Sequence, residues 1–155
     1  MRKLLNFIGG ERVAPASGNF FESFNPSIGE PHLLVGDSDT GDIATAVEAA
    51  KRAFPAWSAT RFEERAAILM RIADRVDAYR AELARAESSD QGKPVWLATQ
   101  MDITRVALNF RFFAGELLHR REHAMRLDET SFSYVLRQPV GVAGLISPWN
   151  LPLYL

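Results

Sequence analysis

Up to Gly36, short apolar runs alternate with glycine- and proline-containing turns, a pattern typical of β-hairpins. Phe7–Val13 predicts a hairpin around a Gly-Gly turn. Phe20–Phe24 predicts a strand, Asn25–Glu30 a tight reversal, and His32–Val35 the returning strand. The chain should therefore begin with small antiparallel units.

The apolar positions then change to the spacing of three and four residues that is typical of helices. A first helix is predicted from about Asp42, whose carboxylate suits an N-cap, to the residue before Pro55. Thr60 and Glu63 have the spacing of a capping box, which predicts the start of a second, long helix. We expect this helix to end near Gly92.

A third helix is predicted from Pro94, because proline suits the first turn of a helix. Phe132–Leu136 alternates in polarity and predicts a half-buried strand. Val140–Ile146 is almost wholly apolar and small, as in a strand buried on both faces of a parallel sheet. The sequence therefore predicts an α/β fold in which a parallel sheet only begins near the end of the chain.

Composition narrows the class of protein. With 155 residues, 47% of them hydrophobic, and a net charge of −1, the chain has no nucleic-acid footprint and no polybasic membrane patch. No window approaches the roughly 20 apolar residues of a membrane-spanning helix. Asn6 and Gly9 break the apolar run at the start of the chain, so a signal peptide is not predicted there. We expect a cytoplasmic protein with neither nucleic-acid nor membrane partners. The absence of cysteine excludes disulfides and a cysteine nucleophile from these residues.

The segment after the predicted buried strand is the strongest candidate for chemistry. Two prolines bracket Trp149 and Asn150, which predicts a rigid loop where α/β proteins place ligands. An asparagine amide can donate to a developing oxyanion, and one such donor contributes about 3–4 kcal/mol. Asparagine beside proline is also common as an ordinary turn residue, so the residues alone leave both interpretations open.

Other features favour structural interpretations. Gly141 and Gly144 lack the third glycine and the spacing of a dinucleotide fingerprint. His119 and His123 lack the acidic partner of a zinc helix, so no metal site is predicted. The phenylalanines around Arg111 have core spacing rather than a base-stacking pattern. A solvated helix face is the interpretation for four carboxylates, Glu63, Glu64, Asp74 and Asp77.

Several motifs resemble, in order and spacing, the start of the aldehyde dehydrogenase superfamily, and together they cover essentially the whole chain. They are Phe7–Gly10, Phe24–Glu30, Ala49–Trp57, Glu64-Arg65, Gln91–Lys93, Pro139–Val142 and Pro148–Asn150. The resemblance implies that residues 1–139 form the amino-terminal hairpins and three main helices. Residues 140–155 would begin a Rossmann-like cofactor domain. In this family a thiohemiacetal on a catalytic cysteine transfers hydride to NAD or NADP, and a glutamate then acts as general base in hydrolysis.

The resemblance also implies residue roles. Asn150 would donate to the thiohemiacetal oxygen. Four residues, Ile146, Ser147, Pro148 and Trp149, would border the nicotinamide ribose side of the cofactor cleft, with NAD as the expected cofactor and NADP possible. The cysteine and the general base of the family would lie beyond Leu155. We therefore expect an inactive fragment of a homo-oligomeric enzyme.

A further set of motifs resembles the 2-aminomuconic and 2-hydroxymuconic semialdehyde dehydrogenase branch: Glu87–Lys93, Met101–Arg105, Asn109–Ala114, Leu118-His119 and Gly144–Leu155. Such substrates carry a carboxylate remote from the aldehyde. Arg105 is the candidate to bind it, because a guanidinium can form two hydrogen bonds with a carboxylate. A solvated helix arginine is the alternative. Leu151 and Tyr154 match substrate-tunnel positions of the family, with ordinary packing as their alternative.

A second class of function is a stand-alone, non-catalytic module that binds or joins a full-length subunit. Two features favour a piece of an enzyme instead. The chain ends within the apolar run Leu151–Leu155, and an isolated Val140–Ile146 strand would leave unpaired edges.

Overall fold

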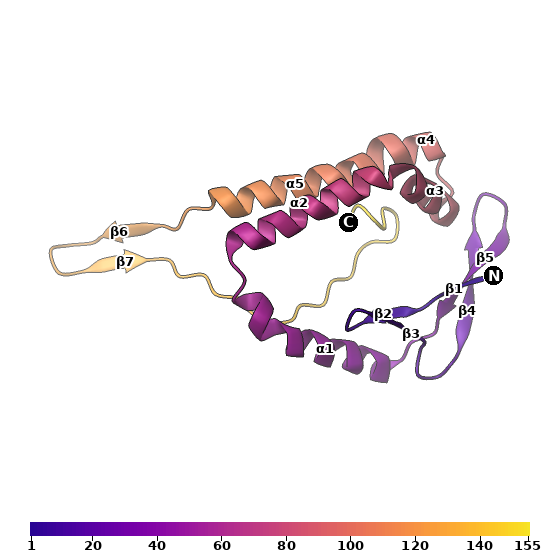
Figure 1. Ribbon diagram of the computed structural model, residues 1–155, viewed down its shortest axis with the longest axis horizontal. Coiled ribbons are helices and arrows are strands. Elements are labelled where there is room, and N and C mark those ends of the chain that lie inside the picture. Colours follow the sequence, from indigo (N-terminus) through magenta and orange to yellow (C-terminus); the bar gives the residue numbers. More distant parts are fainter.

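The computed structural model describes all 155 residues as an α/β arrangement of short strands and longer helices (Figure 1). The strands are β1 (Arg2–Leu4), β2 (Asn6–Ile8), β3 (Glu11–Val13), β4 (Phe20–Asn25), β5 (Glu30–Gly36), β6 (Ala124–Arg126) and β7 (Phe132–Tyr134). The helices are α1 (Thr40–Ser58), α2 (Phe62–Ala78), α3 (Arg80–Gln91), α4 (Val95–Leu97), the π-helix η1 (Ala98–Ile103) and α5 (Thr104–His119). None of the helices has both the length and the apolar character required of a membrane-spanning segment.

The predicted amino-terminal hairpins are confirmed. β2 and β3 pair antiparallel across Gly9 and Gly10, both of which have positive φ angles, as this tight turn requires. β4 and β5 also pair antiparallel, with a register shift at Ser23 and Phe24. The sequence did not predict β1, which pairs parallel with β5 and completes a sheet of order β1-β5-β4.

The first helix begins three residues earlier than the pattern predicted. Asp39, not Asp42, is its N-cap, and the Asp39 carboxylate accepts from the backbone N–H groups of Gly41 and Asp42. Asp42 stands at the third helical position, where its carboxylate accepts from the N–H groups of Asp39 and Ala16. Pro55 lies inside α1 and does not end it. The two aspartates form a reciprocal capping box that also anchors the preceding loop.

The predicted capping box at the start of the second helix is wrong. The N-cap of α2 is Arg61, without a side-chain cap, because the Thr60 hydroxyl donates backwards to the carbonyl of Ala56 in α1. The guanidinium of Arg65 donates to the carbonyls of Ser58 and Thr60 and so binds the otherwise free end of α1. The connection between α1 and α2 is therefore held by an arginine.

The predicted long second helix is two helices. The backbone turns at Tyr79, which ends α2 and begins α3. As predicted, α3 ends at Gly92, here in the left-handed conformation. Pro94 is the N-cap of α4, one position before its predicted place. From Val95 to His119 the chain is helical throughout, with the π-helical turn η1 between α4 and α5.

Helices α2 and α5 lie side by side over most of their length (Figure 1). The Arg111 guanidinium on α5 lies 2.8 Å from carboxylate oxygens of both Asp74 and Asp77 on α2. Arg80 at the start of α3 also donates to Asp77. Asp77 is thus part of an inter-helix ion network and not only of a solvated face, and Arg111 takes part in that network beside the phenylalanines.

The core is small and lies between α2, α3, η1 and α5. Only 13 of 155 residues are buried, and Ile103 is the one large side chain that is fully buried. The main cluster consists of Ala73, Val76, Ala84, Ala98, Ile103, Val106 and Ala107. Most large apolar side chains elsewhere are at least partly exposed, so these residues alone leave much apolar surface uncovered.

The residues after α5 depart most from the secondary structure that the sequence pattern predicted. β7 forms where a strand was predicted and pairs with β6 (Figure 1). Its residues are exposed instead of half-buried. The expected buried strand Val140–Ile146 is absent: these residues have no regular secondary structure, and Ile146 is 99% exposed. A parallel strand needs hydrogen-bonding neighbours, and no other segment of these 155 residues pairs with it.

Candidate functional site

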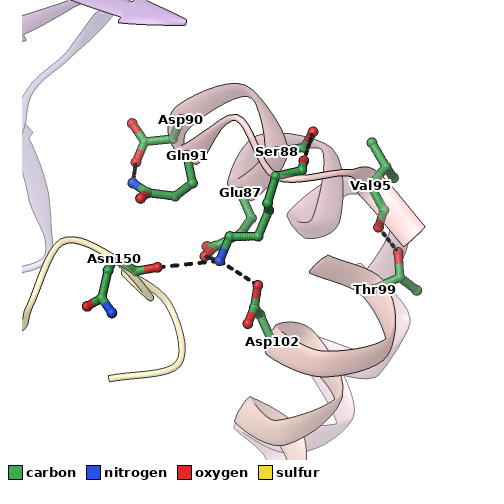
Figure 2. A network of polar contacts seen from close by, with 9 residues as sticks. Glu87, Ser88, Asp90, Gln91, Val95, Thr99, Asp102 and Asn150 are labelled. Carbon is green, nitrogen blue, oxygen red and sulfur yellow. Dashed lines mark hydrogen bonds and ion pairs between the residues drawn. The ribbon is translucent and has the colours of Figure 1, made fainter. Parts of the chain in front are cut away.

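Lys93 follows the end of α3 and contacts three segments of the chain, whose residues Glu87, Asp102 and Asn150 are labelled in Figure 2. Its ammonium lies 3.1 Å from Glu87 Oε1 on α3 and 2.7 Å from Asp102 Oδ2 on η1. It also lies 3.4 Å from the main-chain carbonyl oxygen of Asn150. The three N–H donors of one lysine thus face three acceptors, each from a different element.

These charges are shielded from solvent. The side chains of Glu87 and Asp102 are 3% and 8% exposed, and that of Lys93 is 16% exposed. Burial acts to lower the pKa of the Lys93 ammonium, but the hydrogen bonds that it donates to Asp102 and Glu87, together with the charges of these carboxylates, outweigh burial and leave this pKa raised. Lys93 therefore stays protonated at neutral pH and remains a donor.

Two backbone features, the turn at Gly92 and the π-helix η1, position Lys93 and its partners. Gly92 has φ +74, a conformation that turns the chain sharply after α3. A side-chain carbon on Gly92 would lie 3.0 Å from Pro26 Cγ, so the β4–β5 turn packs against this position. Ser88 also donates to the carbonyl of Lys93 at 2.7 Å. Asp102 is supplied by η1, and single π-turns of this kind are frequent at functional sites.

Asn150 contacts the Lys93 cluster through its backbone alone. Figure 2 shows its side chain directed away from Glu87 and Asp102, and its amide makes no hydrogen bond with the rest of the chain. The following residues form a single turn closed by the Leu155 N–H donating to the Leu151 carbonyl at 3.0 Å. The predicted oxyanion donor is therefore exposed, with its main chain held and its amide free.

The predicted substrate residues lie together at this turn. The Arg105 guanidinium lies 5.8 Å from the centre of the Tyr154 ring, a cation–π contact. Tyr154 also packs against the core cluster, and Leu151 is partly buried. Arg105 itself is exposed. Packing against the core thus holds the Tyr154 ring in place, while the Arg105 guanidinium remains open to solvent.

The predicted cofactor residues precede this turn in an open, extended segment. Ile146 is 99% exposed and Trp149 is 84% exposed, and Ser147 and Pro148 are exposed as well. None of the four accepts a hydrogen bond from the Lys93 ammonium, whose partners are Glu87, Asp102 and Asn150. The structure places all the predicted residues from Ile146 to Tyr154 in sequence along one segment and brings Arg105 to its end.

Sequence reasoning missed the roles of Glu87, Lys93 and Asp102. One signal was available: Glu87 follows the buried Ala84 by three residues, so both occupy the same helix face. An acidic residue on a buried face implies a charged partner. Ala86, the neighbouring apolar residue, is exposed and lies off this buried face.

The chain is similar to known proteins over nearly its whole length. Residues 13–155 match the sequence profile described as the aldehyde dehydrogenase family. The chain is 48% identical over 153 residues to the 2-aminomuconic semialdehyde dehydrogenase of Bos taurus. The aligned residues make up 98% of this chain and 31% of the bovine protein. The chain therefore spans less than a third of the length of this relative.

Solved structures give the same result. A variant of an aldehyde dehydrogenase from Bacillus cereus is 34% identical, with a TM-score of 0.93, over 99% of this chain and 32% of the other. An NAD⁺ complex of an aldehyde dehydrogenase from Bacillus cereus is 31% identical, with a TM-score of 0.82, over 86% of this chain and 28% of the other. The α/β fold is that of the amino-terminal part of these structures.

Proposed function

The chain belongs to the aldehyde dehydrogenase family, and we propose that it forms the amino-terminal part of an enzyme that oxidises a carboxylated semialdehyde to the acid. The substrate would be 2-aminomuconic or 2-hydroxymuconic semialdehyde. The observation that carries this proposal is the identity of 48% to a 2-aminomuconic semialdehyde dehydrogenase over nearly the whole chain. The position of Arg105 beside Tyr154 adds a physical reason for a carboxylate.

Asn150 would stabilise the negative charge that develops on the aldehyde oxygen. When a thiolate adds to the carbonyl carbon, a C–S bond forms and the electron pair of the C=O bond moves to oxygen. A neutral amide donor that is already in place stabilises this oxyanion, and the cost of reorganisation is small. The free amide of Asn150 on a held backbone suits this role.

The cofactor would be NAD, with NADP possible, and it would supply the acceptor for the hydride that leaves the substrate carbon. The residues present fit a nicotinamide. Ile146 and Trp149 expose apolar side chains, and Pro148 restricts the backbone between them. Together with Ser147 they would border the nicotinamide ribose and exclude water from that side.

Arg105 would bind the remote carboxylate of the substrate. Its guanidinium can donate two parallel hydrogen bonds to one carboxylate. Tyr154 restricts the guanidinium from one side, and Leu151 would line the path between the carboxylate and the aldehyde. An uncharged aldehyde would gain nothing from this arginine.

The thiolate and the general base would come from chain outside these 155 residues, which contain no cysteine. We further propose a cytoplasmic homo-oligomer that uses a small-molecule aldehyde and has no nucleic-acid or membrane partner. The division into residues 1–139 and 140–155, the latter as the start of a Rossmann-like domain, is part of the same proposal.

A stand-alone module that binds a full-length subunit is the second candidate. One observation favours it: the β6–β7 hairpin exposes Met125, Phe132 and Tyr134, a surface suited to an intersubunit contact. This candidate needs no thiolate. It predicts a chain that forms complexes but never turns over an aldehyde.

The coding sequence that follows Leu155 separates the two candidates. An open frame that encodes a cysteine in a glycine-rich motif supports the enzyme, and a stop codon supports the module. For the enzyme, the product of that open frame should reduce NAD or NADP with 2-aminomuconic semialdehyde and should use acetaldehyde less efficiently. A product that prefers acetaldehyde would contradict the proposed substrate class.

A further inference from the structure

We propose that Lys93 is a positioning residue for the oxyanion donor: held by two buried carboxylates, its ammonium fixes the main chain of Asn150 and thereby orients the Asn150 amide. This inference rests on the proposed role of Asn150. Lys93 would touch neither substrate nor cofactor. Its effect on the reaction would pass entirely through Asn150.

The arrangement of charges points to orientation rather than to stability. Glu87 and Asp102 each contribute a negative charge and Lys93 one positive charge, so the buried cluster holds one uncompensated negative charge. Buried ion clusters of this kind cost desolvation and are often no more stable than apolar residues of the same volume. Their effect here is geometric, because two carboxylates from different helices restrict the rotation of the ammonium.

The third donor of that ammonium is directed at the segment that carries Asn150. The distance of 3.4 Å from Lys93 Nζ to the Asn150 carbonyl oxygen joins residues 57 positions apart. Because the contact is to the main chain, it restrains the Asn150 backbone and leaves the amide free for another acceptor.

The same segment is also held on its other side. Tyr154 packs on the core cluster and lies over Arg105, and the Leu155 N–H closes the intervening turn. Between Pro139 and Asn150 the chain has no regular secondary structure. The hydrogen bond from Lys93 is thus the first one that this segment receives before the Leu151–Leu155 turn. It is made at Asn150, the residue whose position matters for the proposed reaction.

The test is a double-mutant cycle in the full-length enzyme. Asn150→Ala should lower kcat about 100- to 1,000-fold, the usual effect of losing one oxyanion donor. Lys93→Met should lower kcat by up to about 100-fold, as expected of a misplaced catalytic group, with little change in KM. In the Asn150→Ala background the same Lys93 change should alter kcat by no more than about twofold, because it acts through Asn150.

Two variants complete the design. Lys93→Met leaves two buried carboxylates unpaired and can prevent folding, so a triple variant, Glu87→Gln with Lys93→Met and Asp102→Asn, removes all three charges together. It should reproduce the loss of kcat and the non-additivity. Lys51→Met is the matched control, because it removes an exposed lysine that pairs only with Glu48, and it should retain the kcat of the unmodified enzyme.

The outcomes separate the two proposals. An Asn150→Ala variant with unchanged kcat would overturn the role of Asn150 and with it this inference. If Asn150→Ala is impaired but the loss of Lys93 multiplies the defect, only the positioning role is overturned. A crystal structure of the unmodified enzyme decides the contact without any variant: a Lys93 Nζ more than about 4 Å from the Asn150 carbonyl oxygen contradicts the inference.

Discussion

The guanidinium of Arg105 lies 5.8 Å from the ring centre of Tyr154, so a residue of α5 contacts the last turn of the chain. Tyr154 is partly buried against the core, whereas Arg105 is exposed. The ring therefore restricts the arginine without neutralising it. A cation that is partly fixed and still lacks a counter-ion suits an anionic ligand.

Arg105→Ala in the full-length enzyme should raise KM for a carboxylated semialdehyde about 10- to 100-fold, the effect of losing charge-assisted hydrogen bonds. KM for an uncharged aldehyde of similar length should change little. Steady-state kinetics with both substrates provide the measurement. Equal effects on the two would identify Arg105 as an ordinary solvated arginine. Tyr154→Leu, which removes the ring but leaves the charge, should show a smaller effect of the same kind.

The 155-residue chain by itself should show no NAD-dependent aldehyde oxidation, because no cysteine is present to attack the carbonyl carbon. Absorbance of the reduced cofactor at saturating NAD and semialdehyde is the measurement. Turnover that persists after host dehydrogenases have been removed would contradict this prediction.

Gly92→Ala should destabilise the protein by about 1–2 kcal/mol, because alanine is strained at a positive φ and its Cβ would meet Pro26. Gly115→Ala is the matched control. Gly115 lies within α5 with nothing near its Cβ position, so alanine should stabilise that helix by about 0.5–1 kcal/mol. Urea unfolding followed by circular dichroism measures both. Shifts of the same sign would contradict the assignment of Gly92 as a strained turn residue.

Acid should weaken the contact between α2 and α5. Hydrogen bonds from Arg80 and Arg111 hold the pKa of Asp77 below its ordinary value of 3.8. A lowered pKa in the folded state means that this stabilisation is complete above pH 3.8 and disappears as the pH falls through the folded value. Asp77→Asn should therefore cost about 0.5–1 kcal/mol at pH 7.

The same difference should shrink in acid. Other carboxylates titrate in both proteins and cancel in the comparison of the unmodified protein with Asp77→Asn. Urea midpoints measured at pH 7 and at successively lower values down to pH 2.5 follow the difference. A difference that is independent of pH would show that Asp77 contributes by packing and not by its charge.

Local signals were sufficient for the hairpins and for the end of α3. Gly9 and Gly10 predicted a turn that needs positive φ angles, and Gly92 predicted a left-handed helix end. These features depend on neighbouring residues alone. The family resemblance was likewise predictable, because it is encoded in motif spacing.

Features that depend on distant partners were not predictable from the pattern. The Thr60 hydroxyl had an acceptor in the preceding helix, which removed it from the expected capping box. β1 pairs with β5 although three strands, β2, β3 and β4, lie between them in the sequence. Val140–Ile146 has the composition of a buried strand, but composition does not supply the neighbouring strands that would bury it.

The candidate site divides in the same way. Asn150, Arg105 and Tyr154 were proposed as site residues from motifs, whereas no motif pointed to the buried cluster around Lys93. Each of its members is separated from the others by a helix end or a π-turn, so no local period reveals them. Only the folded chain brings Glu87, Lys93 and Asp102 within hydrogen-bonding distance.

The π-turn η1 has a consequence for how such an enzyme can change. Asp102 lies inside η1, and Arg105 follows it at the start of α5, so one stretch of helix carries both the support of the oxyanion donor and the proposed reader of the substrate. Inserting or deleting a residue there would rotate both side chains about the helix axis at once. With the roles proposed for Asn150 and Arg105, such a change in the length of η1 would alter turnover and substrate preference together.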